Sequence, residues 1–250
     1  PTNRTTLSCL DNFARPSLSS RIRCQLDMKY DFIYLASQSP RRQELLKQIG
    51  VRFELLLPSQ YENAEALELP MANEKAIDYV QRVTLLKSMA ALHRWQLLHQ
   101  SNPKLVWAPI VCADTTVSLS GSPATEILGK PTDVTHATEM LNMLSGKIHH
   151  VYSAVAITRD ETTPAHCVVQ KSQVQFKELS PHQIHAYVGT GEALGKAGAY
   201  GIQGMAASFI QTIQGSYSGI MGLPLYETSE LLKESNVHFG LSTNEPRNPH

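Results

Sequence analysis

Apolar and polar positions along the chain follow two periodicities that together predict an α/β domain. The short apolar run FIYLAS (32–37) reads as a buried strand. In the overlapping segment LASQSPRRQELLKQIG (35–50), leucine and isoleucine then recur at helical spacing. Pro40 can take the first helical position with Ser39 as its cap, and Gly50 closes the run. A strand followed at once by a helix is the start of an α/β unit.

The same periodicities predict the remaining elements. The expected helices are a long amphipathic one within 62–103, a capped one at 133–144, a short one at 181–188 and a last one at 225–235. The expected strands are 110–117, an antiparallel pair at 151–158 and 167–176, and 208–213, with a turn at 120–123. No repeat of solenoid length interrupts them, so we expect one compact domain with two lobes.

Composition narrows the class of protein. The 250 residues suffice for one large domain with a real core, and 42% of them are hydrophobic. Lys plus Arg and Asp plus Glu balance at 22 each, so no overall charge favours nucleic acid or a membrane surface as partner. No apolar run approaches the roughly 20 residues of a membrane span.

Cysteine and histidine usage points to a cytoplasmic protein without zinc. The four cysteines form no CxxC pair and are expected to be reduced thiols. The ten histidines are dispersed, and no set has zinc-ligand spacing.

The first 27 residues differ from the rest. They are rich in Ser, Thr and Arg and lack the apolar stretch of a secretory signal. An organelle presequence and a disordered extension are the two interpretations, and we favour the extension because MKYDFIYLAS resembles a natural chain start. The expected organisation is an extension at 1–27, a domain at 28–238 and a tail at 239–250.

Arg41 and Arg42 occupy the first turn of the predicted helix, where the helix dipole disfavours cations. A helix N-terminus binds anions through its free N–H groups, and neighbouring arginines add charge-assisted hydrogen bonds. The preceding loop supplies the hydroxyls of Ser37 and Ser39. Two interpretations stay open here: a phosphate-binding turn, or a capped surface helix whose arginines point to solvent. The sequence has no Walker motif.

Asp114 and Lys130 are further candidates. Asp114 follows a buried apolar run, which predicts a place at the carboxyl end of a strand, where α/β sheets bind ligands. A carboxylate there can hold a divalent cation or orient water, and the alternative is a capping residue. Lys130, between a glycine and a proline, is placed to clamp a phosphate.

The stretch GEALGKAGAYGIQG (191–204) is rich in small residues, which let backbone approach a ligand closely. Lys196 is its only cation. The Gln203 amide offers a donor and an acceptor, which suits the edge of a nucleobase or the loop's own backbone. Spacing alone leaves both roles open.

Taken together, these segments resemble the Maf family of nucleoside triphosphate pyrophosphatases. The matching pieces are LASQSPRRQELL, ADTTV, ILGKP, MLNMLSGKIHHVYSAVAI, GKAGAYGIQG and GSYSGIMGLPL, which occur in the family's order over roughly residues 30–236. The form KAGAYGIQG is similar to the branch that acts on dTTP and UTP. Around residues 63–80 the chain looks longer than is usual in the family.

The resemblance implies a fold related to inosine triphosphatase: an elongated mixed sheet flanked by helices, with a cleft between two lobes. It implies attack of water on the α-phosphate, releasing a nucleoside monophosphate and pyrophosphate with help from a divalent cation, Mg²⁺ or Mn²⁺. The implied catalytic residues are Asp114 as base with Lys87 and Lys130, and the implied metal ligands are Glu62 and Asp114. The implied substrate-binding residues are Ser37, Ser39, Arg41, Arg42, Thr115, Lys196 and Gln203.

Two alternatives and one question remain. A nucleotide-binding regulator without catalysis would keep Arg41 and Gln203 but would not need Asp114. A house-cleaning enzyme for modified pyrimidine nucleotides would use the same residues as one for canonical nucleotides. The sequence does not decide between a monomer and a homodimer.

Overall fold

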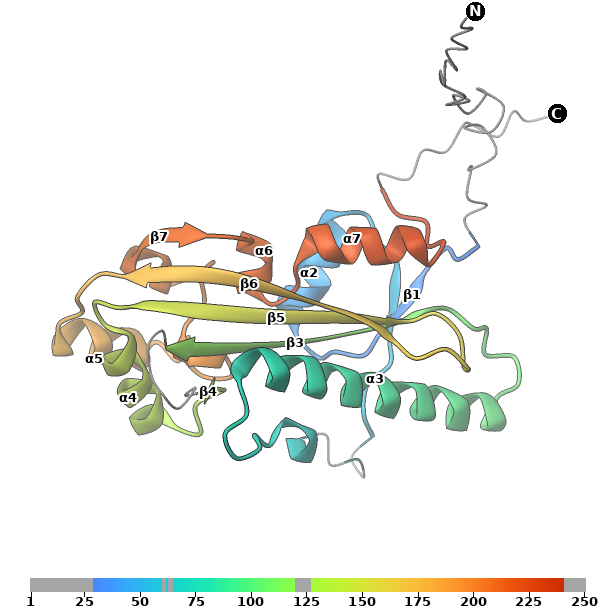
Figure 1. Ribbon diagram of the computed structural model, residues 1–250, viewed down its shortest axis with the longest axis horizontal. Helices are drawn as coiled ribbons and strands as arrows, with labels where there is room; N and C mark the ends of the chain where they lie inside the picture. Colours follow the sequence, from blue (N-terminus) through green and yellow to red (C-terminus); the bar gives the residue numbers. More distant parts are fainter. Residues whose placement is uncertain (1–28, 60–61, 63–64, 120–126, 241–250) are drawn as a thin grey trace, which may run out of the picture.

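A mixed sheet with helices on both faces forms the frame of the molecule (Figure 1). The computed structural model describes residues 29–59, 62, 65–119 and 127–240. The strands in this part of the chain are β1 (Ile33–Leu35), β2 (Phe53–Leu55), β3 (Ile110–Leu119), β4 (Ile127–Leu128), β5 (Ile148–Thr158), β6 (His166–Phe176) and β7 (Ile210–Gln214).

Parallel and antiparallel pairs share this sheet, whose strand order is β2-β1-β3-β5-β6-β7, with β4 paired to β3. Strand β1 runs parallel to β2 and β3, whereas β3, β5, β6 and β7 pair antiparallel. The longest ladders join β3, β5 and β6 and make the sheet elongated, as Figure 1 shows. The predicted elongated mixed sheet is confirmed.

The helices divide between the two faces and the far end of the sheet. They are α2 (Pro40–Gln48), α3 (Ala76–Ser101), α4 (Val134–Leu144), α5 (Pro181–Gly189), α6 (Tyr217–Met221) and α7 (Leu225–Glu234), with short 3₁₀ turns η1 (Glu65–Glu68), η2 (Ala197–Ala199) and η3 (Met205–Phe209). In Figure 1, α3 runs along one side of β3, whereas α2 and α7 lie on the opposite side of the sheet. Helices α4 and α5 cover the far end.

Local sequence explains where two of these helices begin. The Asp133 carboxylate accepts the backbone N–H of His136 at 2.8 Å and caps α4. Ser180 and Gln183 form a reciprocal capping box at the start of α5. Ser39 holds the cap position of α2 as predicted, but its side chain makes no capping hydrogen bond.

Side chains of β3 alternate between two apolar clusters. Ile110 and Cys112 pack with Trp95 of α3, whereas Val111 and Ala113 pack with the residues of α2 and α7. A strand buried on both faces carries apolar residues at every position, which is why this run has no polar alternation.

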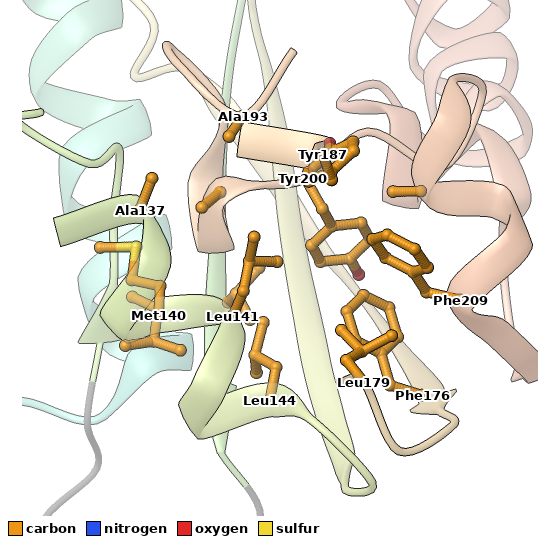
Figure 2. Packing of buried hydrophobic residues seen from close by; sticks show 14 of the residues in the cluster. Ala137, Met140, Leu141, Leu144, Phe176, Leu179, Tyr187, Ala193, Tyr200 and Phe209 are labelled. Atoms are coloured by element: carbon orange, nitrogen blue, oxygen red, sulfur yellow. The ribbon is translucent and has the colours of Figure 1, made fainter. Parts of the chain in front are cut away.

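A third cluster fills the far end of the molecule and combines aliphatic side chains with a group of aromatic rings. Figure 2 shows Phe176, Tyr200 and Phe209 gathered beside Leu141 and Leu144 of α4. The Phe176 and Tyr200 rings meet edge to face with centroids 4.9 Å apart. The core is therefore divided between the two ends of the sheet, in agreement with two lobes.

Most of the predicted elements are confirmed, and the differences follow from pairing across the sheet. Asp114 was expected at the end of its strand, but β3 continues to Leu119 because the residues after Asp114 pair with β5. The last strand starts at Ile210 rather than at residue 208, since the preceding residues form η3. The pattern missed the short elements β2, β4 and α6.

The ends of the chain are only partly described. The predicted turn at 120–123 and the predicted extension at 1–27 lie outside the described residues. Phe239 is 1% exposed in the core and the Gly240 N–H bonds the Ile49 carbonyl at 3.1 Å, so the first two residues of the predicted tail belong to the packed fold. Within the described residues, no helix combines the length and apolarity needed to cross a membrane.

Candidate active site

One cavity of about 1290 Å³ collects all the side chains that the sequence singled out. Its lining comes from the start of α2, from the middle of α3 and β3, and from the loop between α5 and η3. The predicted residues on its wall are Ser37, Ser39, Arg41, Arg42, Glu62, Lys87, Asp114, Thr115, Lys130, Lys196 and Gln203. Their roles stay predictions, but the structure brings them together.

Asp114 faces α3 because it shares the parity of Ile110 and Cys112 along β3. Asp114 is 7% exposed, and its Oδ1 accepts a hydrogen bond from Lys87 Nζ at 2.6 Å. Lys87 lies on α3, so the helix that covers the sheet also supplies the counter-ion for this carboxylate. A buried carboxylate needs such a partner to stay ionised.

Glu68, in the 3₁₀ turn η1, is a cavity side chain that sequence reasoning missed. Lys87 Nζ lies 2.7 Å from its Oε1, and Lys130 Nζ lies 3.1 Å from its Oε2. Burial acts to raise the pKa of Glu68, but the two lysines outweigh it and the net pKa is lowered. Glu68 is therefore a carboxylate held between the two lysines that the resemblance assigns to catalysis.

Arg41 and Arg42 turn back from α2 to the end of α6. Arg41 Nε donates to the Met221 carbonyl at 3.3 Å, and Arg42 Nε donates to the Gly222 carbonyl at 2.8 Å. Arg42 Nη1 also donates to Ser37 Oγ at 3.1 Å. The surface-helix interpretation is wrong, because both guanidinium groups are fixed on the cavity wall by backbone carbonyls.

Gly222 makes this docking possible. Its φ of +122° lies in a region that side chains disfavour, whereas a Cβ there would meet Arg42 Nε and Thr115 Oγ1 only at 3.7 Å, an ordinary contact distance. Thr115 faces away from α3 and shares a 2.9 Å hydrogen bond with Ser153 on β5. Ser153 in turn donates to the Gly219 carbonyl at 2.6 Å. This chain of bonds fixes α6 on the sheet.

The loop that carries Lys196 and Gln203 forms the opposite wall. Gly198 has a φ of +67° and its Cα lies so close to Val117 that a Cβ would meet Cγ2 at 2.9 Å. A Cβ on Gly201 would likewise meet the Lys196 stem at 3.0 Å. Glycine thus allows the loop to pack tightly on β3 while Lys196 lies across it.

Arg41, Arg42 and Lys196 line the wall without an acidic side chain among the hydrogen bonds described for them, which go to backbone carbonyls and to a serine hydroxyl. Burial lowers the pKa of Arg41 and of Arg42, with Asp114 partly opposing the effect on Arg42. Burial and the charge of Arg41 lower the pKa of Lys196. Cations that burial and mutual repulsion disfavour are stabilised when an anion binds among them.

Glu62 has a different environment from the one expected of a metal ligand. Its oxygens accept from Arg94 Nε at 2.9 Å and from Arg94 Nη2 at 2.6 Å, and Oε1 also accepts the Ser59 N–H at 3.2 Å. These hydrogen bonds lower the pKa of Glu62. Sequence reasoning also missed Arg94, which lies two helical turns after Lys87 on α3.

The chemistry of the cavity follows from these positions. The five cationic side chains of Arg41, Arg42, Lys87, Lys130 and Lys196 surround a space that also holds the buried Asp114 carboxyl group. Such a site can neutralise a polyanion, while the carboxyl group beside it can accept a proton or bind a cation. Among the described residues, no group of three His, Cys, Asp or Glu side chains gathers to hold a metal by itself.

Comparison with known proteins identifies the family of the chain. The family model described as Maf-like protein matches residues 32–235. The dTTP/UTP pyrophosphatase of Cupriavidus pinatubonensis is 51% identical over 210 residues, which cover 84% of this chain and 100% of that protein. The dTTP/UTP pyrophosphatase of Ralstonia nicotianae is 52% identical over 205 residues, or 82% of this chain and 94% of that protein.

Solved structures include a more distant match. The Ham1 protein of Staphylococcus aureus aligns over 58% of this chain and 71% of its own, at 11% identity and a TM-score of 0.32. The family model spans residues 32–235, and these include every residue of the cavity wall named above. The chain belongs to the Maf family.

Proposed function

We propose that this protein is a nucleoside triphosphate pyrophosphatase that hydrolyses dTTP and UTP, and modified pyrimidine triphosphates of the same shape, to nucleoside monophosphate and pyrophosphate. The observation that carries the proposal is the buried Asp114 carboxylate on Lys87 inside a cavity walled by Arg41, Arg42 and Lys196. The relatives named dTTP/UTP pyrophosphatase support the substrate class.

The chain's own residues supply a base and a positive surface. Asp114, paired with Lys87, accepts a proton from the water that attacks the α-phosphate. Lys87 and Lys130 give up their hydrogen bonds to Glu68 and bind phosphate oxygens in its place. They thereby stabilise the charge that collects on the leaving pyrophosphate. Arg41 and Arg42, already fixed on backbone carbonyls, hold the remaining phosphate oxygens.

A divalent cation fits the donor set through Asp114. Mg²⁺ is commonly held by one or two carboxylates together with substrate phosphates, and when bound it neutralises phosphate charge and activates water. Glu62 fits this role less well, because both of its oxygens are already bonded to Arg94. We propose Asp114 as the protein ligand, with Glu62 joining only where the Arg94 pair opens.

The pyrimidine base is proposed to meet Gln203, which is exposed on the cavity wall at the end of the glycine-rich loop. Uracil and thymine present acceptors on either side of one N–H donor. A glutamine amide answers that pattern with one donor and one acceptor.

The setting of the reaction is also part of the proposal. Cys112 and Cys167 are free thiols, which supports a reducing compartment such as the cytoplasm. The substrate is a free nucleotide rather than a nucleic acid, in keeping with the balanced charge of the chain. A homodimer is also part of the proposal, and it rests on the sequence alone.

The test is a panel of triphosphates. We expect the full chain to convert UTP and dTTP to the monophosphate and pyrophosphate in equal amounts, with CTP and GTP slower by at least tenfold. Release of inorganic phosphate in place of pyrophosphate contradicts attack at the α-phosphate. Calorimetric binding of UTP without any turnover identifies a nucleotide-binding regulator instead. Turnover of a methylated or pseudouridine triphosphate faster than UTP identifies the house-cleaning substrate.

A further inference from the structure

Glu192 has more contacts with the glycine-rich loop than any role assigned so far explains. It lies between α5 and η2, half-buried, just before the loop that carries Lys196 and Gln203. Its carboxylate accepts a hydrogen bond from Tyr187 Oη at 3.1 Å and one from the Met205 N–H at 2.9 Å. Its own backbone carbonyl accepts a hydrogen bond from Lys196 Nζ.

These contacts join the two ends of one loop. Lys196 lies near the start of the loop, and Met205 follows directly after its last glycine. Gln203 stands two residues before Met205, so the bond to the Met205 N–H fixes the backbone close to the glutamine. Without the bond from the Met205 N–H to Glu192, the end of the loop 193–205 would be held mainly by hydrogen bonds of local turns.

The loop packs directly onto the carboxylate. A Cβ on Gly204 would lie 2.2 Å from Glu192 Oε1 and 2.5 Å from Oε2. The backbone beside Gln203 therefore rests on the Glu192 side chain, and only a glycine allows that approach. Gly204 has an extended φ of −108°, so space and not backbone strain excludes a side chain here.

Tyr187 gives the carboxylate a rigid support. Tyr187 is 3% exposed, and its ring meets Phe209 edge to face with centroids 5.2 Å apart. Figure 2 shows Tyr187 and Phe209 among the packed core residues at the far end of the molecule. The carboxylate thus connects a fixed core to the loop on the cavity wall.

We propose that Glu192 is a positioning residue for base recognition: it holds Gln203, through the Met205 N–H and the Gly204 backbone, where the pyrimidine edge is read. It does not touch the reacting phosphate. The inference rests on the proposed function, and it deepens that function by naming what sets the geometry of the base reader. A loosened loop lowers affinity for the correct base more than for a wrong one, because only the correct base uses the aligned amide.

The first experiment compares Glu192→Ala with Glu192→Gln. Alanine removes both acceptors, whereas glutamine can accept from the Met205 N–H through Oε1 and donate to Tyr187 Oη through Nε2. We expect Glu192→Ala to lower kcat/KM for UTP at least tenfold, mainly through KM, and to lower the UTP-to-GTP ratio of kcat/KM. Glu192→Gln should stay within about threefold of the parent on both measures.

Gly204→Ala supplies an independent variant that keeps Glu192. Its new Cβ must push the flexible carboxylate away from the Met205 N–H, so we expect the same fall in the UTP-to-GTP ratio. In the double variant with Glu192→Ala, the two losses should not add, since both remove one contact. Glu139→Ala, an exposed glutamate on α4, is the matched control and should behave as the parent.

The outcomes separate this inference from the proposed function. Wild-type hydrolysis of UTP to pyrophosphate tests the function alone. Equal losses for UTP and GTP in Glu192→Ala and Gly204→Ala overturn the positioning role and leave only a structural one. A Glu192→Gln variant as impaired as Glu192→Ala also overturns it, because the hydrogen bonds would then not be what matters.

Discussion

The ammonium of Lys87 lies 2.6 Å from the carboxylate of Asp114, and the pair is enclosed between α3 and β3. The same ammonium lies 2.7 Å from Glu68. One lysine therefore joins the proposed base to a carboxylate from a different element. Substrate binding has to rearrange the second contact without disturbing the first.

Asp114→Asn tests the first contact. An amide cannot accept a proton from water, so turnover of UTP should fall by about 10²–10⁴ while UTP binding persists. The measurements are kcat from pyrophosphate release and the Kd from calorimetry. Asp31→Asn is the matched control, because the Asp31 side chain is 76% exposed and forms a surface ion pair with Arg52. Turnover within tenfold of the parent would remove Asp114 from the chemistry.

Glu68→Gln tests the second contact. Loss of the charge frees Lys87 and Lys130 for phosphate oxygens, so we expect KM for UTP to fall by about threefold to tenfold with kcat within twofold. Initial rates over a range of UTP concentrations separate the two constants. A loss of kcat instead would mean that Glu68 takes part in turnover, and no change at all would mean that the two ion pairs do not compete with substrate.

Metal removal is expected to stop the reaction. Chelation with EDTA should abolish pyrophosphate release, and added Mg²⁺ or Mn²⁺ should restore it, because phosphate charge then lacks its largest neutralising partner. Glu62→Gln in the same assay should leave the Mn²⁺ concentration for half-maximal rate unchanged if Arg94 is the permanent partner of Glu62. Full activity in chelator would exclude a metal from the mechanism.

His149 predicts how stability depends on pH. Its ring is fully buried, its Nε2 shares a 2.9 Å hydrogen bond with Tyr200 Oη, and burial lowers its pKa from 6.5 to about 3. Below pH 6.5 the unfolded chain binds a proton that the folded chain refuses, so the free energy of unfolding falls as the pH falls. At pH 5 the loss from this group is about 2 kcal/mol.

The measurement is urea unfolding at pH 7.5 and pH 5.0, for the parent and for His149→Asn. Asparagine does not titrate in this range, so the drop in stability between the two pH values should be about 2 kcal/mol smaller in the variant. The comparison uses the slope with pH, and it therefore remains valid if the variant is less stable throughout. Identical slopes would show that His149 can accept a proton in the folded state.

Gln203→Glu tests base recognition directly. The change replaces the amide donor by a charge, and loss of one paired contact costs about 1–3 kcal/mol. We expect kcat/KM for UTP and dTTP to fall at least tenfold, with a much smaller change for GTP. If UTP, dTTP, CTP and GTP all fall together, Gln203 supports the loop and does not read the base.

The sequence predicted the elements well where the signal was local. The caps and periodicity of 133–144 placed α4, and the leucines after Pro40 placed α2. Asp114 is predicted at a strand end because it follows a buried apolar run, and only the ladder with β5 shows that the strand continues. That pairing joins distant segments, and no window of the sequence contains it.

The site shows the same division. The resemblance brought together the residues of the cavity wall, but their partners are remote in sequence: Arg42 meets a carbonyl 180 residues away, and Lys130 meets Glu68 62 residues away. Glu68 carries no local signal, since it lies on a short 3₁₀ turn without helical periodicity. Glu192 likewise reads in the sequence as one more polar residue beside glycines.

Arg41 and Arg42 are tethered to main-chain carbonyls, which gives the cavity two kinds of cation. A peptide carbonyl orients a guanidinium without cancelling its charge, so an arriving phosphate meets both groups already aimed and has no ion pair to break. Lys87 and Lys130 must first part from Glu68. At one end of the cavity the arginines are preorganised to bind phosphate, and at the other end phosphate must compete with Glu68 for the two lysines. Only a ligand long enough to reach both ends, a triphosphate rather than a monophosphate, gains enough contacts to offset the displacement of Glu68.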